Sequence, residues 1–302
     1  MKRKLMPTAS ASIRIIDTPE QMHSLSGEIR SSGRRLGLVP TMGALHEGHL
    51  SLMRLARAQC DVVAASIFVN PLQFGPNEDF DKYPRMFESD CHKLEAEKVS
   101  LLFAPTTEAM YPPGAKTFVE VGEISDRLDG RSRAGHFRGV ATVVTKLFTI
   151  VQPDVAFFGQ KDAAQVAIIQ RLVRDLNLDV RIVVAPIVRE SDGLAMSSRN
   201  AYLSPQERKQ APVLYRALMR VQKLADQGER NTAKLIASGK AVIAEEPGVR
   251  LDYFEIVDPQ TLQGVSDLRS GALVAVAAYV GTTRLIDNVL LSGGGEVRTS
   301  LR

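Results

Sequence analysis

The chain has 302 residues, of which 44% are hydrophobic and 24% charged, a balance typical of a globular protein with one or two domains. Its formal net charge of +4 suits an anionic small-molecule ligand, and its basic residues are too scattered to indicate a nucleic-acid-binding stripe. Its two cysteines, Cys60 and Cys91, match no disulfide framework or zinc pattern and indicate a reducing compartment.

The N-terminal segment, residues 1–11, carries Lys2, Arg3 and Lys4 and is then rich in Ser, Thr and Ala. Because it has no continuous apolar run of the kind found in secretory signals, we interpret it as a disordered lead-in, with a transit peptide as the minor alternative. No later stretch is long and apolar enough to cross a membrane. Together with the cysteine usage, these features predict a cytoplasmic protein without a membrane partner.

The most informative stretch joins an apolar strand over 36–39 to a helix over 49–59 and breaks at Gly43 between them. A helix that begins after such a break presents free backbone N–H groups and the positive end of its dipole, which suits a phosphate. His46 and His49 lie where a nucleotide's phosphates would bind. The stretch therefore predicts a nucleotide site.

Two other interpretations of this histidine pair stay open. A zinc site would need a third protein ligand, and the remaining histidines, His23, His92 and His136, show no suitable spacing. A purely structural pair is the second alternative. The helix start favours phosphate binding, in which imidazolium groups would donate hydrogen bonds to the charge that develops during transfer.

Strands and helices alternate through the first two thirds of the chain. Further apolar stretches of strand length occupy 62–69, 99–103, 155–158 and 180–184, and segments with helical periodicity occupy 86–98, 137–151 and 163–176. This alternation predicts an α/β fold, namely a Rossmann-like, doubly wound parallel sheet with helices on both faces. Ligands of such sheets lie at the carboxyl ends of the strands, where the polar clusters of this chain also fall.

Two of these polar clusters directly follow strands. Asn70 and Gln73 come after the strand over 62–69, and Lys161 opens the helix that contains Gln165. A lysine at the start of a helix opposes the dipole, which favours a lysine held for an anion over a merely solvated one. The two glutamine amides suit the hydroxyl and carboxylate of a substrate, although either alone is more typical of an ordinary surface residue.

Other polar groups are weaker candidates. Asp79, Asp81 and Asp90 follow the second strand, and one of them, for which we choose Asp90, would assist a hydrated Mg²⁺. A solvated acidic face is the plainer explanation for each. The basic segment 131–139 would screen an anion. Behind it lies an apolar stripe at helical spacing that predicts core packing alone: Phe137, Val140, Val144, Leu147 and Val151.

The pattern changes near residue 187, which divides the chain into a nucleotide-binding domain over 1–186 and a smaller α+β lid domain over 187–302. Within the second domain the sequence predicts one charged helix, two strands and a polar, glycine-rich tail: 205–227, 251–257 with 272–280, and 292–296.

A polar loop lies early in the second domain and reads Met196-Ser197-Ser198-Arg199-Asn200. On composition alone it is equally well a plain loop. Since Arg199 can fork two phosphate oxygens, its occurrence after a His-x-Gly-His helix start favours a loop that folds over a triphosphate.

Five motifs lie between residues 40 and 200, and the resemblance that they carry runs from about residue 13 to 290, nearly the whole chain. They are Pro40-Thr41-Met42-Gly43-Ala44-Leu45-His46-Glu47-Gly48-His49, Phe68-Val69-Asn70-Pro71-Leu72-Gln73-Phe74, Gly135-His136-Phe137-Arg138-Gly139-Val140, Phe157-Phe158-Gly159-Gln160-Lys161-Asp162 and Met196-Ser197-Ser198-Arg199-Asn200. In this order they resemble the pantothenate synthetase family, the pantoate–β-alanine ligases. The His-x-Gly-His element alone is shared by a broad nucleotidyltransferase superfamily, whereas the five together are highly specific.

The resemblance implies an ATP-dependent ligase that condenses pantoate with β-alanine in two steps. The pantoate carboxylate attacks the α-phosphorus of ATP, giving pantoyl adenylate and pyrophosphate. The β-alanine amine then attacks the acyl group and releases pantothenate and AMP. The resemblance also implies Mg²⁺ beside the ATP and a homodimer.

The resemblance also assigns residues. It implies that His46, His49 and Lys161 are catalytic, with His49 as the family's proton donor. Because attack by a carboxylate has no proton to move, we interpret both histidines as stabilising phosphate charge. Implied substrate contacts are Gln73, Gln165 and Asn70, with Gln73 facing both pantoate and β-alanine. Implied ATP contacts are Met42, Gly43, Ala44, Leu45, His46, Glu47, Gly48, His49, Gly159, Gln160, Lys161, Asp162, Val188, Met196, Ser197, Ser198 and Arg199.

Two further classes remain as alternatives. Another adenylyl- or cytidylyltransferase of the superfamily, or a fragment of a class I aminoacyl-tRNA synthetase, would share the helix start. A synthetase, however, would carry a tRNA-binding extension and a lysine-bearing loop in place of Met-Ser-Ser-Arg. A non-enzymatic nucleic-acid-binding protein is suggested only by the pI near 9.1, and such proteins need stacking aromatics, whereas this chain has no tryptophan.

Overall fold

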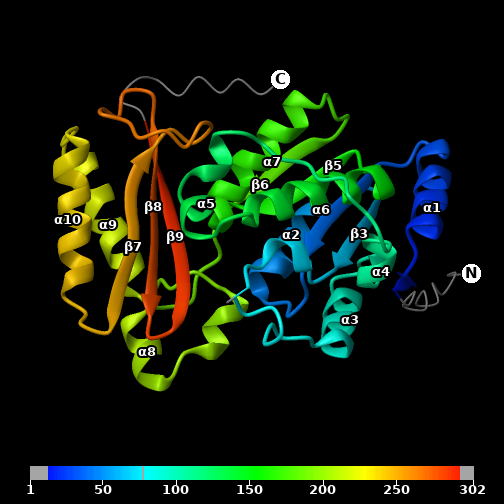
Figure 1. Cartoon of the computed structure of the whole chain (residues 1–302), viewed down its shortest axis with the longest axis horizontal. Helices are drawn as coiled ribbons and strands as arrows, with labels where there is room; N and C mark the ends of the chain where they lie inside the picture. Colours follow the sequence, from blue (N-terminus) through cyan, green and yellow to red (C-terminus); the bar gives the residue numbers. More distant parts are fainter. Residues whose placement is uncertain (1–12, 77, 293–302) are drawn as a thin grey trace, which may run out of the picture.

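The computed structural model of the chain describes residues 13–76 and 78–292. The expected lead-in over 1–11 lies outside these residues, as does the expected tail except for Ser292. Figure 1 shows a layered α/β part beside a smaller part that contains a sheet of long strands. Within the described ranges, none of the helices is long and apolar enough to cross a bilayer.

The larger part is built on a six-stranded sheet whose paired strands all run parallel, in the order β1-β4-β3-β2-β5-β6. The strands are β1 (Arg14–Ile16), β2 (Leu36–Thr41), β3 (Val62–Ile67), β4 (Leu101–Phe103), β5 (Val155–Gly159) and β6 (Arg181–Ala185). The chain passes from β2 through β3 to β4 on one side and then returns to place β5 and β6 on the other. The strand order therefore reverses between β2 and β5, which is where ligands of such sheets bind.

Helices cover both faces of this sheet, which confirms the predicted Rossmann-like α/β fold. One face packs against α1 (Pro19–Ser31), α6 (His136–Val151) and α7 (Ala163–Asp175), and the other against α2 (Glu47–Arg57) and α3 (Phe87–Ala96). Along β2, Leu36 and Leu38 enter the first core and Val39 the second. A parallel strand buried on both faces in this way reads as a continuous apolar run.

Short elements connect these layers and surround the pocket described below. They are α4 (Thr107–Met110), α5 (Asp129–Ser132) and the 3₁₀ turns η1 (Pro71–Gln73), η2 (Ile124–Asp126), η3 (Gln160–Asp162) and η4 (Ser198–Tyr202).

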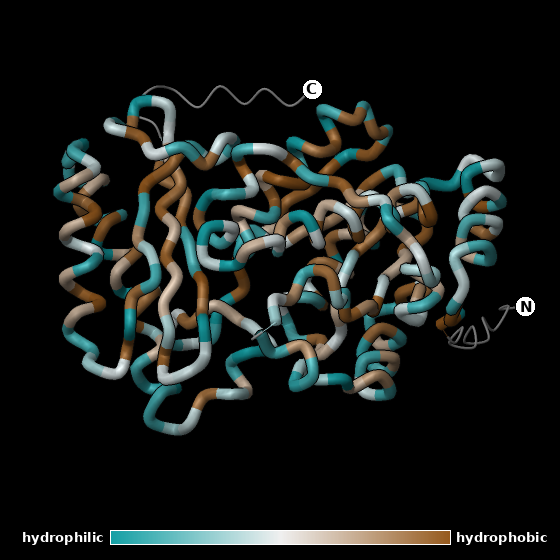
Figure 2. Tube along the Cα trace, in the orientation of Figure 1, coloured by the Kyte–Doolittle hydropathy of each residue, from teal (hydrophilic) through white to brown (hydrophobic). Residues whose placement is uncertain are grey.

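The smaller part is an antiparallel sheet of β7 (Val249–Val257), β8 (Ala272–Val280) and β9 (Thr283–Leu291), together with α8 (Pro205–Gln210), α9 (Val213–Asp226) and α10 (Thr232–Ala244). Its middle strand, β8, is apolar on both faces. Leu273 and Ala275 join the core of the larger part, whereas Val274 and Val276 pack with residues of α9 and α10. Figure 2 shows hydrophobic residues along these strands. The sheet therefore lies between the core of the larger part on one face and α9 with α10 on the other.

The structure adds strands and helices that the sequence pattern did not predict: β1, α1, the short α4 and α5, α10 and β9. The charged helix expected over 205–227 is two helices, because Pro212 has no N–H to continue the first and occupies the N-cap of the second. One hydrophobic core cluster, from Leu194 to Leu291, belongs wholly to the later part of the chain. Another core cluster contains residues from both sides of residue 187, so the division into two domains at that residue stays a prediction.

Candidate active site

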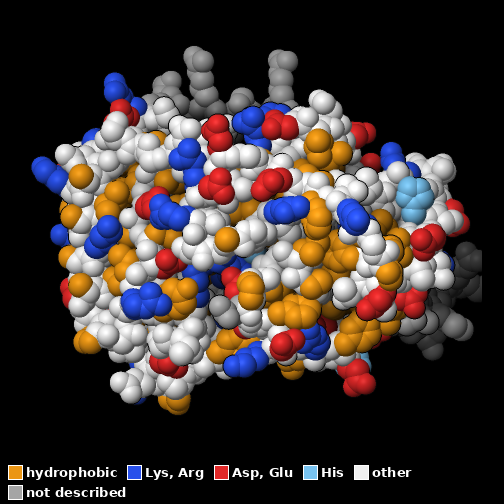
Figure 3. All heavy atoms as spheres, in the orientation of Figure 1, with side chains coloured by type: hydrophobic (Ala, Val, Ile, Leu, Met, Phe, Trp, Pro, Cys, Tyr) orange, Lys and Arg blue, Asp and Glu red, His pale blue; other side chains and the backbone are white. Residues whose placement is uncertain are grey.

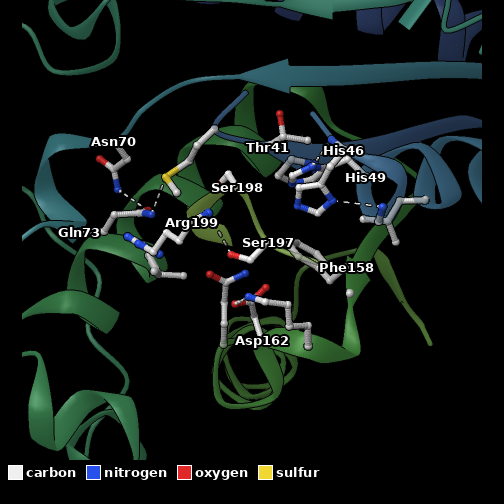
Figure 4. Close-up of a pocket in the computed structure, with 18 of the residues that line it drawn as sticks. Thr41, His46, His49, Asn70, Gln73, Phe158, Asp162, Ser197, Ser198 and Arg199 are labelled. Carbon is white, nitrogen blue, oxygen red and sulfur yellow. Dashed lines mark hydrogen bonds and ion pairs between the residues drawn. The ribbon is translucent and has the colours of Figure 1, made fainter. Parts of the chain in front are cut away.

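A pocket opens at the carboxyl ends of β2 and β5, at the reversal of strand order. Its lining comes from the loops after β2, β3 and β5, from α2, α6 and α7, and from the segment that follows β6. Figure 4 shows Gln73, Asp162 and Arg199 around it. On the face in Figure 3, acidic and basic side chains are interspersed over both parts of the chain. The pocket lies where the sequence placed the ligand site.

Most of the residues predicted to contact ATP or substrate line this pocket. They are Met42, His46, Gly48, His49, Asn70, Gln73, Gly159, Lys161, Asp162, Gln165, Val188, Met196, Ser197, Ser198 and Arg199. Six predicted residues do not belong to the lining: Gly43, Ala44, Leu45, Glu47, Gln160 and Asp90. Glu47 pairs with Arg54, and Gln160 bonds to Asn288.

The two histidines cap the N-terminus of α2. The Nδ1 atom of His46 accepts the N–H of Gly48 at 3.2 Å, and Nδ1 of His49 accepts the N–H of His46 at 3.3 Å. Their ring centroids lie 4.1 Å apart. Since Nδ1 is an acceptor in each ring, Nε2 carries the proton, and the pair presents two N–H donors in the pocket wall.

Gly48 is required by this arrangement of the rings. A Cβ atom at position 48 would lie 2.9 Å from Cε1 of His46, a distance that side chains essentially never adopt. The glycine of the His-x-Gly-His element therefore lets the first ring fold back over the helix start.

Both histidines are neutral in the ligand-free protein. Burial, followed by the charge of Lys161, lowers the pKa of His46 to about 4. Burial, followed by the proximity of His46, lowers the pKa of His49 to about 3. The donors that the structure presents are therefore neutral Nε2–H groups, whereas the sequence led us to expect imidazolium donors.

These pKa shifts predict a loss of stability in mild acid. His46, His49 and also His136, whose pKa burial lowers to about 4, have folded-state pKa values below the ordinary 6.5. As pH falls from about 6.5 toward about 4, the unfolded chain takes up protons that the folded chain refuses, so the free energy of unfolding decreases. Thermal unfolding followed from about pH 7.5 to pH 5 should show a falling Tm. The His136→Gln variant should show a shallower fall, and an unchanged Tm in the wild type would contradict these shifts.

Asp90 holds the loop before α2 and does not face the pocket. Its side chain is fully buried, and its two oxygens accept the N–H groups of Ala44 and Leu45, each at 2.8 Å. Lys93, one turn further along α3, donates to the carbonyl of Leu45 at 2.7 Å. Because this carboxylate is turned to the loop amides, it does not fit the magnesium role that we assigned to it from the sequence. Asp162 is the aspartate that lines the pocket.

The other end of the pocket is organised around Asn70 and Gln73. Asn70 is 1% exposed and donates to Oε1 of Gln73 and to the carbonyl of Gly139, both at 3.1 Å, while Tyr111 donates to its Oδ1 at 2.9 Å. A Cβ at Gly139 would lie 2.2 Å from the carbonyl oxygen of Leu72, so only glycine at this position allows α6 to lie this close to η1. The polar atoms of Asn70 are thus used to orient the amide of Gln73.

The structure brings further residues to the site that the sequence did not assign to it individually. His136, on the first turn of α6, contacts the carbonyl of Gln73 through Nδ1 at 2.8 Å, and Arg133 pairs with Glu78 at 2.6 Å. Tyr83 also lines the pocket. The signal for His136 and Arg133 was the basic segment 131–139, which fell short of naming them.

The apolar stripe of α6 is more than core. Val140, Val144 and Leu147 line the pocket together with Val143, so the expectation that this stripe serves core packing alone was wrong for these positions. Helical periodicity shows that a face is buried, but it does not show whether that face meets another helix or the wall of a binding site.

The predicted phosphate loop lies against the segment after η1. Arg199 donates from Nε and Nη2 to the two oxygens of Asp79, at 3.0 and 2.9 Å, and Tyr83 Oη lies 3.2 Å from Ser198 Oγ. The forked geometry expected for phosphate is therefore present, with a carboxylate in place of the phosphate.

A doubly wound parallel sheet with a His-x-Gly-His helix start at its switch point defines an α/β protein of the nucleotidyl-transferring class. A family model described as Pantoate-beta-alanine ligase matches residues 14–290. The chain therefore belongs to the pantoate–β-alanine ligase family, which confirms the resemblance, and it is an enzyme of that ligase class.

Relatives agree in sequence and in structure. The chain is 58% identical over 286 residues to the pantothenate synthetase of Koribacter versatilis, covering 95% of this chain and 98% of that protein. It is 65% identical over 258 residues to that of Acidobacterium capsulatum, covering 85% and 86%. A solved pantothenate synthetase from Thermus thermophilus superposes with a TM-score of 0.87 at 47% identity, covering 92% and 99%.

A second solved relative was determined with ligands. The pantoate-beta-alanine ligase of Francisella tularensis superposes with a TM-score of 0.77 at 35% identity, covering 92% of this chain and 97% of that one. Its structure is described as complexed with Beta-gamma ATP and Beta-alanine.

Proposed function

We propose that this chain condenses pantoate with β-alanine through an enzyme-bound pantoyl adenylate, releasing pyrophosphate and AMP. The observation that carries the proposal is the presence in one pocket of two histidine Nε2–H donors, Lys161 and the amides of Gln73 and Gln165. Phosphate-binding groups and groups suited to a small hydroxy acid thus face one another. The complex of the Francisella tularensis relative supports ATP and β-alanine as ligands.

The phosphate end of the pocket stabilises charge. During attack by the pantoate carboxylate, negative charge grows on the phosphate oxygens of ATP, and the neutral imidazole N–H groups and the Lys161 ammonium donate to it. No side chain forms a covalent intermediate in this scheme. Holding carboxylate and α-phosphorus in line supplies the remaining acceleration, because effective molarities of oriented reactants reach about 10⁵ M or more.

The acceptor end suits pantoate, which carries a carboxylate, two hydroxyl groups and a carbon bearing two methyl groups. Gln73 and Gln165 offer amide groups to the polar side of such a molecule, and Asn70 fixes the first of these amides. The valines of α6 offer an apolar wall to the methyl groups. In this way the corrected role of the α6 stripe becomes part of substrate recognition.

The phosphate loop completes the site by exchanging partners. When a triphosphate enters, Arg199 would leave the carboxylate of Asp79 for phosphate oxygens of the same forked geometry. Ser197, the N-cap of η4, and Ser198, its first residue, would move with Arg199 toward the phosphates. A loop closed in this way keeps water away from the acyl adenylate.

Mg²⁺ fits the site through Asp162 and not through Asp90. Magnesium keeps most of its water and takes one or two carboxylates plus phosphate oxygens, and Asp162 is the aspartate in the pocket lining. Bound there, the ion would neutralise phosphate charge and orient the leaving pyrophosphate. Lys161, with Nζ 3.5 Å from Oδ1 of Asp162, would then share the same phosphates.

A homodimer and a cytoplasmic location stay predictions. Phe118, 43% exposed and stacked under the guanidinium of Arg138 at 4.0 Å, is an aromatic side chain of the kind enriched at interfaces. Light scattering of the purified chain would measure the oligomeric state, and a Phe118→Glu variant would show whether this side chain belongs to the contact.

The proposed function predicts a pyrophosphate burst that depends on pantoate. With ATP and Mg²⁺ present and β-alanine withheld, pantoate should release about one equivalent of pyrophosphate per site, because the adenylate stays bound. Addition of β-alanine should then start turnover to pantothenate and AMP. Release with a different carboxylate but not with pantoate would keep the nucleotide site and overturn the substrate.

A further inference from the structure

One strand of the smaller part bonds directly to the lysine segment of the pocket. Asn288, on β9, is 3% exposed and donates from Nδ2 to the carbonyl oxygens of Gln160 and Lys161, both at 2.9 Å. Its Oδ1 accepts from Nε2 of Gln160 at 3.0 Å. The whole side-chain amide of Asn288 is therefore used on two consecutive residues of η3.

This contact fixes a segment that has little other local support. Between β5 and α7 the chain makes only the single 3₁₀ turn η3. The N-cap of η3 is Gly159, which has no side chain to cap it, and Asp162 at the N-cap of α7 makes no side-chain capping bond. Two successive carbonyls held by one amide set the direction of the main chain at Lys161. The direction of the main chain in turn sets where the ammonium group of Lys161 can reach in the pocket.

Asn288 is itself held firmly. Its neighbour Asp287, also 3% exposed, accepts the N–H of Asn288 at 2.7 Å and receives Arg189 on its two oxygens at 2.7 and 2.9 Å. The Arg189 guanidinium stacks over the ring of Tyr215 at 4.4 Å. Arg189 directly follows Val188 of the pocket wall, so β9 contacts two of the segments that the sequence assigned to ATP, at Gln160–Lys161 and beside Val188.

We propose that Asn288 is a positioning residue for Lys161, through which the C-terminal part of the chain sets the phosphate-binding lysine in place. The proposal rests on the proposed function, because it assigns the docked position of β9 to the adenylation step. Asn288 does not line the pocket and acts through the lysine. A C-terminal sheet that is displaced would release the lysine, so docking of the two parts and competence for ATP are coupled.

A double-mutant cycle tests the proposal. Asn288→Ala should lower kcat/KM for ATP in pantoate-dependent pyrophosphate release by about 10-fold or more, the scale of a slight misplacement of a reacting group. In the Lys161→Met background the same change should cost about 2-fold or less, because residues that act as one unit are not additive. Losses that multiply in the double variant, or a wild-type kcat/KM in Asn288→Ala, would overturn the proposal.

Two further variants separate positioning from folding. Asn288→Asp is nearly isosteric but turns a carboxylate oxygen toward two carbonyls, so it should reproduce the loss while keeping the native circular dichroism spectrum; wild-type activity in this variant would overturn the proposal. Leu290→Ala, at a position of the same strand that is 51% exposed, should leave kcat/KM unchanged. Arg284→Met removes the ion pair of β9 to Asp129, a contact between the two parts away from Lys161. Because this ion pair helps to dock β9, any loss of kcat/KM that its removal causes should also shrink to about 2-fold or less in the Lys161→Met background, and a loss that multiplies there would overturn the coupling between docking and the lysine.

Failure of the role proposed for Asn288 can be distinguished from failure of the proposed function. If the wild-type chain releases no pyrophosphate with pantoate, the proposed function fails, and the cycle is then measured on ATP affinity by calorimetry with ATP and Mg²⁺ alone. Non-additive losses of ATP affinity would support the role of Asn288, whereas additive losses would overturn it. If the wild type is active and the cycle is additive, only the role of Asn288 fails.

Discussion

Replacing His49 with asparagine should slow pyrophosphate release in a single turnover by about 10²-fold, a loss of about 2.7 kcal/mol of transition-state stabilisation. The asparagine carbonyl can still accept the N–H of His46 in place of Nδ1, so the cap of α2 is kept. The Nε2–H donor is lost, and with it the hydrogen bond that we propose it donates to the phosphate oxygens of ATP. Since this donor is preorganised and its ring is neutral, its main contribution is made when charge develops, and KM for ATP should change less than kcat.

Two companion variants define the result for His49. His49→Gln places an amide N–H near the position of Nε2 and should recover part of the lost rate. His92→Ala removes an exposed histidine of α3 outside the pocket and should behave as the wild type. A His49→Asn variant with the wild-type rate of pyrophosphate release would show that this ring has no part in the chemistry. A rise in KM with unchanged kcat would limit the ring to ATP binding.

The architecture, and the position of His49 and Lys161 in one pocket, were predictable because they rest on local rules. Five apolar stretches of strand length, separated by helical periods, are sufficient for a doubly wound parallel sheet. Such a sheet brings the carboxyl ends of its strands to one edge, so that His49 after β2 and Lys161 after β5 meet although 112 positions separate their numbers. The five motifs added the family, which spacing alone does not specify.

Strand β9 shows why the rest was not predictable. It contains Asp287 and Asn288 side by side, and both residue types are depleted in strands, so the stretch did not read as one. In the folded chain their cost of burial is offset by Arg189 and by the main chain of η3, groups that lie about 100 or more positions away in the sequence. Partners so distant leave no local pattern.

For Asp90 and the apolar stripe of α6, the sequence did give a prediction, and the prediction was wrong. A carboxylate near a predicted phosphate site suggested a metal ligand, but the loop over Gly43, Ala44 and Leu45 needs an acceptor for its own N–H groups, and Asp90 supplies it. The α6 valines suggested core, but part of their buried face borders the ligand. The sequence showed correctly that Asp90 is an acceptor and that the α6 stripe is buried. Only the tertiary structure shows which groups these side chains contact.

The Lys161→Met variant should slow pyrophosphate release by about 10²-fold and raise KM for ATP, because the only group removed is the ammonium that, in the proposed function, binds phosphate charge both before and during transfer. Methionine keeps most of the aliphatic stem, so packing at η3 should persist. The same variant has a second, independent readout in the histidines. The charge of Lys161 is the second cause, after burial, that lowers the pKa of His46, so removing it should move that pKa upward toward 6.5.

An NMR titration of the His46 ring in the wild type and in Lys161→Met measures this second effect without any substrate. Lys209→Met, which removes an exposed lysine on α8, is the matched control for both readouts and should change neither. A slow variant with an unshifted His46 pKa would place the ammonium away from the histidine pair, and the loss of rate would then have to come from a displaced η3. A shifted His46 pKa with a wild-type rate of pyrophosphate release would place the ammonium of Lys161 beside the histidine pair and would show that it does not contribute to phosphate transfer. Only the combination of a slow first half-reaction and a raised pKa supports the geometry proposed here, in which one lysine, held by the C-terminal sheet, adds to burial in keeping both imidazoles neutral.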